Sequence, residues 1–133
     1  IIYTDGDDKI LIGYSGLEAE LVLPDGITEI YRYAFYGNDR ITKVTLQGNV
    51  KSIGDYAFVG CIRLTSINIP HSVASVGHDV FLYCFSLTIY CEATEKPSGW
   101  DSGWNNIWDS SLDPGSSNTD YYCRVEWGVT KSE

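Results

Sequence analysis

The sequence predicts a strand-rich α/β fold, a right-handed solenoid of short stacked coils. The first observation is a repeat of 23 residues that aligns residues 18–40, 41–63 and 64–86. A unit of this length cannot bury its apolar face alone and needs a stacked neighbour. The second observation is a set of apolar columns shared by the three units: Leu21, Val44 and Ile67; Leu23, Leu46 and Ile69; Ile27, Val50 and Val73; Ile30, Ile53 and Val76; Phe35, Phe58 and Phe81.

Residues 1–17 precede the repeats and are expected to form an N-terminal β-hairpin cap. Apolar residues flank the segment Asp5-Gly6-Asp7-Asp8, and Asp-Gly is a strong hairpin signal. The hairpin would protect the open edge of the first coil. The acidic segment also resembles part of a calcium loop, but the further oxygen ligands and the Glu at the twelfth position do not follow. We therefore favour a turn, and we expect no metal or other cofactor.

Each repeat, within residues 18–86, is expected to contain a strand, a turn and a short helical segment. Residues 64–69 alternate apolar and polar side chains, which is typical of a half-buried strand. Pro or Gly then ends the strand, as at 24–26. Residues 55–58 predict one turn of helix that places Phe58 in the core. The column of Asn38, Cys61 and Cys84 is expected to satisfy backbone groups of the buried loop.

Residues 87–133 are expected to form a final strand and an aromatic C-terminal cap. The repeat slips by about one residue at Leu87, and residues 122–127 predict a last strand. Residues 113–119 are rich in Ser and Gly and predict a loop. Trp100, Trp104 and Trp108 recur every four residues and would share one face of a helix. We favour a plug over the open end of the solenoid, and a stacking surface for sugars is the alternative.

The repeat pattern resembles the BspA-like leucine-rich repeat family, which includes the treponemal leucine-rich repeat proteins. The clearest copy is residues 53–70, IGDYAFVGCIRLTSINIP, and the resemblance covers residues 17–91. Single columns depart from the pattern at Tyr31, Gln47 and Val80. The resemblance implies a bacterial surface or secreted protein that binds host or neighbouring-cell proteins. We expect the 133 residues to form a single domain of this kind.

Charge and composition exclude several classes of protein. The net charge of −9 is unsuitable for a general nucleic-acid binder, and no apolar run is long enough to span a membrane. The acidic excess lies in residues 1–40 and 92–133, where each segment carries eight acidic and three basic side chains. This distribution is typical of solvated end caps. The chain begins at Ile1 and lacks Met, so we expect a trimmed or mature fragment, in which a missing signal peptide says nothing about export.

Catalysis has little support in the sequence. His71 and His78 occupy columns in which the other repeats carry unrelated residues, and no nucleophile motif accompanies them. Cys91 and Cys123 are compatible with a disulfide or with two buried thiols. No Cys-x-x-Cys pair supports a zinc site. We therefore expect a non-enzymatic protein.

The outward strand positions of successive coils offer the candidate binding face. In a solenoid these positions align into rows that are the usual place for partners. The alternatives are glycan binding through Tyr90 and exposed cap tryptophans, and a structural spacer in a longer surface protein. The sequence leaves the oligomeric state open. The candidate residues form two rows: Glu20, Lys43 and Ser66; Val22, Thr45, Asn68 and Tyr90.

Overall fold

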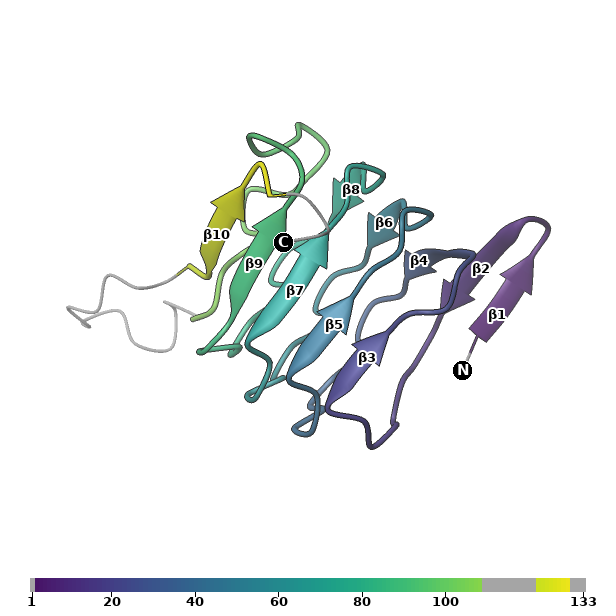
Figure 1. The fold of residues 1–133 in the computed structure, drawn as a ribbon, viewed down its shortest axis with the longest axis horizontal. Coiled ribbons are helices and arrows are strands. Elements are labelled where there is room, and N and C mark those ends of the chain that lie inside the picture. The colour runs from purple at the N-terminus through teal and green to yellow at the C-terminus, as the bar shows by residue number, and fades with distance from the viewer. Residues whose placement is uncertain (1, 109–121, 130–133) are drawn as a thin grey trace.

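The protein is a β-solenoid built from two five-stranded sheets (Figure 1). The structure is a computed structural model that describes residues 2–108 and 122–129, so the loop expected at 113–119 lies outside it. One sheet has the order β1-β2-β4-β6-β8 and the other β10-β9-β7-β5-β3. The strands are β1 (Ile2–Asp5), β2 (Asp8–Leu11), β3 (Glu20–Val22), β4 (Ile27–Ile30), β5 (Lys43–Thr45), β6 (Ser52–Ile53), β7 (Ser66–Ile69), β8 (Ser75–Val76), β9 (Thr88–Cys91) and β10 (Arg124–Trp127).

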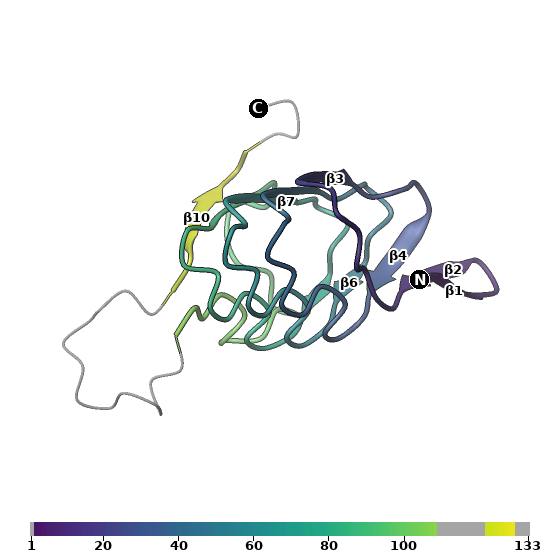
Figure 2. The ribbon, with the colours of Figure 1, turned by 90° about the horizontal axis from the view of Figure 1, so that it is seen from below.

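The 23-residue period is confirmed by the register of the strands. Val44 pairs with Leu21 on one side and with Ile67 on the other, in parallel strands. The second sheet repeats the arrangement through Ile30, Ile53 and Val76. The slip expected near Leu87 is also present, because Ile67 pairs with Ile89, only 22 residues later. Each coil therefore contributes one short strand to each sheet, and Figure 2 shows the coils stacked side by side.

The predicted turn of helix at residues 55–58 is wrong, since this part of each coil is a series of turns. Backbone N–H groups alternate between two kinds of partner. Ala57 donates to the Gly54 carbonyl three residues back, whereas Phe58 donates to the Val80 carbonyl in the next coil. An α-helix needs every N–H to reach the carbonyl four residues back. Within the segment equivalent to residues 55–58, each coil also has a residue in the left-handed region, which a right-handed helix excludes: Tyr33, Tyr56 and Asp79, with φ of 60°, 58° and 52°.

The core is a set of apolar columns that run along the solenoid. The expected Phe35, Phe58 and Phe81 are each fully buried. Their rings stack, with centroids 4.6 and 5.5 Å apart. Tyr14 lies against the first ring at 5.3 Å and Trp104 against the last at 6.3 Å. Five aromatic rings therefore form one continuous row through the interior.

The column that follows the Phe residues has the predicted hydrogen-bonding role. The Asn38 side-chain oxygen accepts from the backbone N–H groups of Arg40 and Ile41. The thiols of Cys61 and Cys84 instead donate to the carbonyls of Phe35 and Phe58 in the preceding coils, at 3.2 and 3.1 Å.

The N-terminal residues form the predicted hairpin. β1 and β2 pair antiparallel across a turn in which Gly6 has a φ of 61°. β2 then pairs parallel with β4, so the hairpin extends only one of the two sheets. Figure 2 shows it projecting from the end of the solenoid. In the other sheet, β3 is the edge strand.

The tryptophan segment continues the solenoid as a partial coil and is not helical. Trp100 forms a parallel bridge with Val76, and Asp79 donates its N–H to the Gly103 carbonyl. Backbone bonds to the preceding coil thus replace helical bonds. The predicted last strand is present as β10, parallel to β9.

Candidate functional site

The seven candidate residues lie on one sheet, in rows that cross its strands. Glu20 pairs with Lys43, and Lys43 with Ser66, so the first row crosses β3, β5 and β7. β9 continues it through Thr88. The second row begins with Val22 opposite Thr45 in β3 and β5, and Asn68 opposite Tyr90 continues it in β7 and β9. The structure therefore brings the candidate residues together as the sequence predicted, although their role in binding stays a prediction.

Exposure varies across this face. Glu20 and Lys43 are exposed, and Val22 is 60% exposed although it is apolar. Thr45 and Tyr90 are half-buried. Among the seven candidate residues, the exposed ones are therefore those on β3 together with Lys43 on β5.

Asn68 already has intramolecular partners. Its side-chain oxygen accepts from the Leu46 N–H at 2.7 Å, and its side-chain nitrogen donates to the Leu46 carbonyl at 3.0 Å. The carboxamide thus pairs with the backbone of the neighbouring coil where β5 has ended. Asn68 therefore stabilises the fold. Its position in the second row of candidate residues did not predict these bonds.

β10 adds residues to the face that sequence analysis missed. Arg124 pairs with Thr88 and Glu126 with Tyr90, so they extend the two rows. Their side chains form an exposed ion pair with nitrogen and oxygen 3.1 Å apart. The alternation Arg-Val-Glu-Trp matches Thr-Ile-Tyr-Cys in β9, and this signal could have aligned the two strands.

The four tryptophans differ in burial, and Trp127, which packs against Trp100 and Trp104, is the most exposed of them at 36%. Trp100 is 3% exposed and Trp104 is 2% exposed, so neither presents a face to a sugar. Trp108 is half-buried and packs against Tyr83 and Phe85. The sugar-stacking alternative therefore loses the first two of its cap tryptophans.

His78 lies between two carboxylates. Its Nε2 is 3.2 Å from an Asp55 oxygen and its Nδ1 is 3.2 Å from an Asp79 oxygen. Asn106 donates to the other Asp79 oxygen at 3.1 Å. Within residues 2–108 and 122–129, no Ser, Thr or Cys side chain hydrogen-bonds to this imidazole. The arrangement lacks the nucleophile that a triad requires and ties two coils together.

The other histidine has a simpler environment. His71 is exposed, and its backbone N–H donates to the Glu92 carboxylate at 2.8 Å. In the part of the chain that the structure describes, no three His, Cys, Asp or Glu side chains gather as a metal-binding group.

All four cysteines are buried free thiols. Cys91 lies opposite Trp127, whereas Cys123 directly precedes Arg124, the partner of Thr88. The two cysteines are thus offset by four strand residues, about 13 Å, and a disulfide needs Cα atoms within about 7 Å. Of the two interpretations left open by the sequence, the buried thiols are correct.

Burial acts on the protonation of these thiols. It raises the pKa of Cys91 and of Cys123 to about 12. The pKa of Cys84 is also raised, by a side-chain hydrogen bond with Cys61 and by burial. None of these thiols is a thiolate nucleophile at neutral pH.

The strands, their spacing and the stacked Phe residues agree with a known repeat family. A family model described as BspA type leucine-rich repeat region (6 copies) matches residues 14–94. The chain belongs to the BspA-type leucine-rich repeat family. Proteins with this repeat are generally scaffolds for protein interaction and typically non-enzymatic.

Two solved structures resemble this BspA-type chain. One is a leucine-rich repeat protein of T. pallidum, with 28% identity, a TM-score of 0.65, and coverage of 84% of this chain and 52% of that one. The other, a leucine-rich cell surface protein of Faecalibacterium prausnitzii A2-165, has 22% identity, a TM-score of 0.59, and coverage of 98% and 44%. The chain thus spans about half the length of each. No curated protein matches the sequence.

The described residues contain no helix that is long and apolar enough to cross a membrane.

Proposed function

We propose that the outer face of the β10-β9-β7-β5-β3 sheet binds a protein on or outside the bacterial cell, and that the chain is a non-enzymatic adhesion module. The observation that carries this proposal is the alignment of side chains from five strands in two rows. Rows of this kind form a continuous surface that an extended or flat partner can contact.

The chemistry of the face supports a protein partner. Glu20, Lys43 and Ser66 have no side-chain hydrogen bond or ion pair within the described residues, so their polar groups are free to bond a partner. Val22 and Tyr90 add apolar surface beside them. A protein interface combines apolar area with hydrogen-bonding groups in this way.

The proposed location has support from similar proteins. One solved relative is described as a cell surface protein. The family resemblance to bacterial surface proteins supports the same location for this chain. A structural spacer remains the rival, and it requires no partner for the sheet face.

The test is a pull-down from host extracellular-matrix and cell-surface proteins with the 133-residue chain as bait. The binding variant carries Lys43→Ala, Thr45→Ala and Tyr90→Ala together, and leaves Asn68 intact because of its bonds to Leu46. The expected result is a partner that the wild type retains at physiological salt and the variant loses.

A matched control makes the result specific. Lys9→Ala and Lys51→Ala change exposed residues in or next to the other sheet. This control variant should retain the partner. Equal capture by all three proteins, or capture by none, would contradict the proposal, and the second result would favour the spacer.

A further inference from the structure

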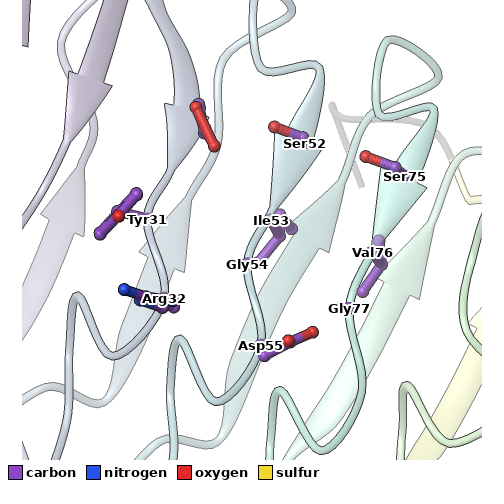
Figure 3. Close-up of a pocket in the computed structure, with 10 residues that line it drawn as sticks. Tyr31, Arg32, Ser52, Ile53, Gly54, Asp55, Ser75, Val76 and Gly77 are labelled. Carbon is purple, nitrogen blue, oxygen red and sulfur yellow. The ribbon is translucent and has the colours of Figure 1, made fainter.

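A second surface, on the opposite sheet, carries its own set of unpaired polar groups. It is a shallow groove of about 390 Å³ that crosses β4, β6 and β8 (Figure 3). Three successive coils line the groove, so equivalent residues recur along it at the spacing of adjacent strands.

A row of side-chain oxygens lines the groove. Glu29 pairs with Ser52, and Ser52 with Ser75, so one carboxylate and two hydroxyls stand in line across three strands. Figure 3 shows the two serine side chains pointing the same way from adjacent coils. Within the described residues these three side chains have no hydrogen-bond partner. They present both donors and acceptors to a ligand.

The next row has no side chains of its own in two of the coils. Gly54 and Gly77 occupy the positions that follow Ile53 and Val76 in the core. A Cβ on Gly54 would meet the Arg32 nitrogen at 2.6 Å, and one on Gly77 would meet the Asp55 side-chain oxygen, with the Asp55 nitrogen at 2.7 Å. The adjacent coils are too close there for side chains, so the two glycines line the groove without filling it.

In the first coil Tyr31 occupies the glycine position, and Arg32 follows it. Tyr31 is 38% exposed, and the Arg32 guanidinium lies 5.4 Å from the centre of its ring. Asp55 lines the groove too, but its oxygens already bind the His78 backbone N–H at 3.0 Å and the imidazole Nε2. The groups available to a ligand are therefore Glu29, Ser52, Ser75, Tyr31 and Arg32.

We propose that this groove binds a neutral oligosaccharide. A sugar has an apolar face that suits the Tyr31 ring and hydroxyls that pair with a carboxylate, a guanidinium and serine hydroxyls. The mixed charges disfavour ions, because Glu29 repels an anion and Arg32 repels a cation. A peptide strand would need an unpaired sheet edge, whereas Ser52 already has strand neighbours on both sides.

The test is a titration of the ¹⁵N-labelled chain with four neutral hexasaccharides: cellohexaose, chitohexaose, laminarihexaose and maltohexaose. The amide signals of Gly54 and Gly77 report on the groove floor. At least one sugar should shift them in a saturable way, with a dissociation constant of about 1 mM, as a shallow and solvent-exposed site implies. Tyr31→Ala should weaken this binding by about tenfold.

Three controls make the test decisive. Tyr36→Ala removes a 69% exposed tyrosine outside the groove and should leave binding unchanged. The Lys43, Thr45 and Tyr90 variant should also bind the sugar as the wild type does, which separates this site from the protein-binding face. Sodium sulfate, calcium chloride and an extended hexapeptide serve as other probes.

Several results would overturn the assignment. They are the absence of glycine shifts with any sugar at about 10 mM, an equal loss of binding in Tyr36→Ala, and glycine shifts produced only by the ions or the peptide. A Tyr31→Ala variant that stays folded, judged by its dispersed amide spectrum, and binds as tightly as the wild type would do the same.

Discussion

The Asn68 carboxamide both accepts from and donates to the Leu46 backbone. A side chain that faces outward from a strand can therefore serve the fold and be unavailable to a partner. Ser66, two residues earlier on the same face, has no such bond within the described residues. Position in a row alone does not distinguish the two residues.

Asn68→Ala should lower the free energy of unfolding by about 1–2 kcal/mol, because the N–H and carbonyl of the buried Leu46 lose their partner. Urea denaturation measures the change. Ser66→Ala, the control, should change it by no more than about 0.5 kcal/mol. Equal effects of the two substitutions would show that the bonds to Leu46 do not stabilise the fold.

The buried thiols make stability depend on alkaline pH. Cys91 and Cys123 have an ordinary pKa of 9.0, and burial raises each pKa to about 12. Between these values the unfolded chain has lost thiol protons that the folded chain keeps. Stability is thus fully present below the unfolded pKa and is lost as pH rises from 9.0 toward about 12.

Urea denaturation at about pH 7 and about pH 10 should show this loss. The variant with Cys91→Ala and Cys123→Ala should lose less stability over the same interval, although its stability at neutral pH is lower. The same loss in both proteins would assign the alkaline effect to other groups.

At the scale of the elements, adjacent coils approach each other closely at Gly54, Gly77 and Gly99. A Cβ on Gly54 would lie 2.6 Å from the Arg32 backbone nitrogen, whereas a Cβ on Gly48 has no neighbour within 4 Å. Neither glycine has a positive φ. The two positions therefore differ chiefly in the space that is available for an added methyl group.

Gly54→Ala should destabilise the protein by about 1–3 kcal/mol, because backbone must move to admit the methyl group. Gly48→Ala, the matched control, should be neutral or stabilising by up to about 1 kcal/mol. Thermal and urea denaturation of both variants make the comparison. A Gly54→Ala variant as stable as Gly48→Ala would mean that the coils tolerate wider spacing.

The elements also show which features the sequence could predict. Apolar spacing was sufficient for the strands and their register, since burial in a solenoid repeats with the sequence. It was insufficient at residues 55–58, because a helical turn and a series of turns bury the same Phe. Only the left-handed backbone of Tyr56 and the hydrogen bonds to the next coil distinguish the series of turns from a helical turn.

The candidate face was predicted in outline and missed in detail. Its rows followed from the 23-residue alignment. The 23-residue alignment could not predict the extension by Arg124 and Glu126, because β10 lies outside the repeats and pairs with β9 over a long sequence separation. The bonds of Asn68 also required coordinates.

At the scale of the whole molecule, the aromatic row from Tyr14 to Trp104 connects every coil of the core. Phe58 is its central ring and is fully buried. Each coil depends on its neighbours for burial. Damage at the centre should accordingly affect the stability of the entire solenoid.

Phe58→Ala should cost about 3–5 kcal/mol and still give a single unfolding transition, as a single domain predicts. Ile62→Ala, which changes a 53% exposed residue, should cost far less. Circular dichroism and intrinsic fluorescence should report coincident transitions in each protein. Two separate transitions in the wild type would contradict the single-domain proposal.

The most direct measurement of the central claim is photo-crosslinking on intact target cells, with a benzophenone side chain at Thr45 or at Lys51. Thr45 lies on the proposed protein-binding face, and Lys51 directly precedes β6 of the other sheet. We predict one specific cell-surface protein crosslinked from position 45 and absent from position 51. A partner crosslinked only from position 51, or from neither position, would contradict the assignment of the binding face.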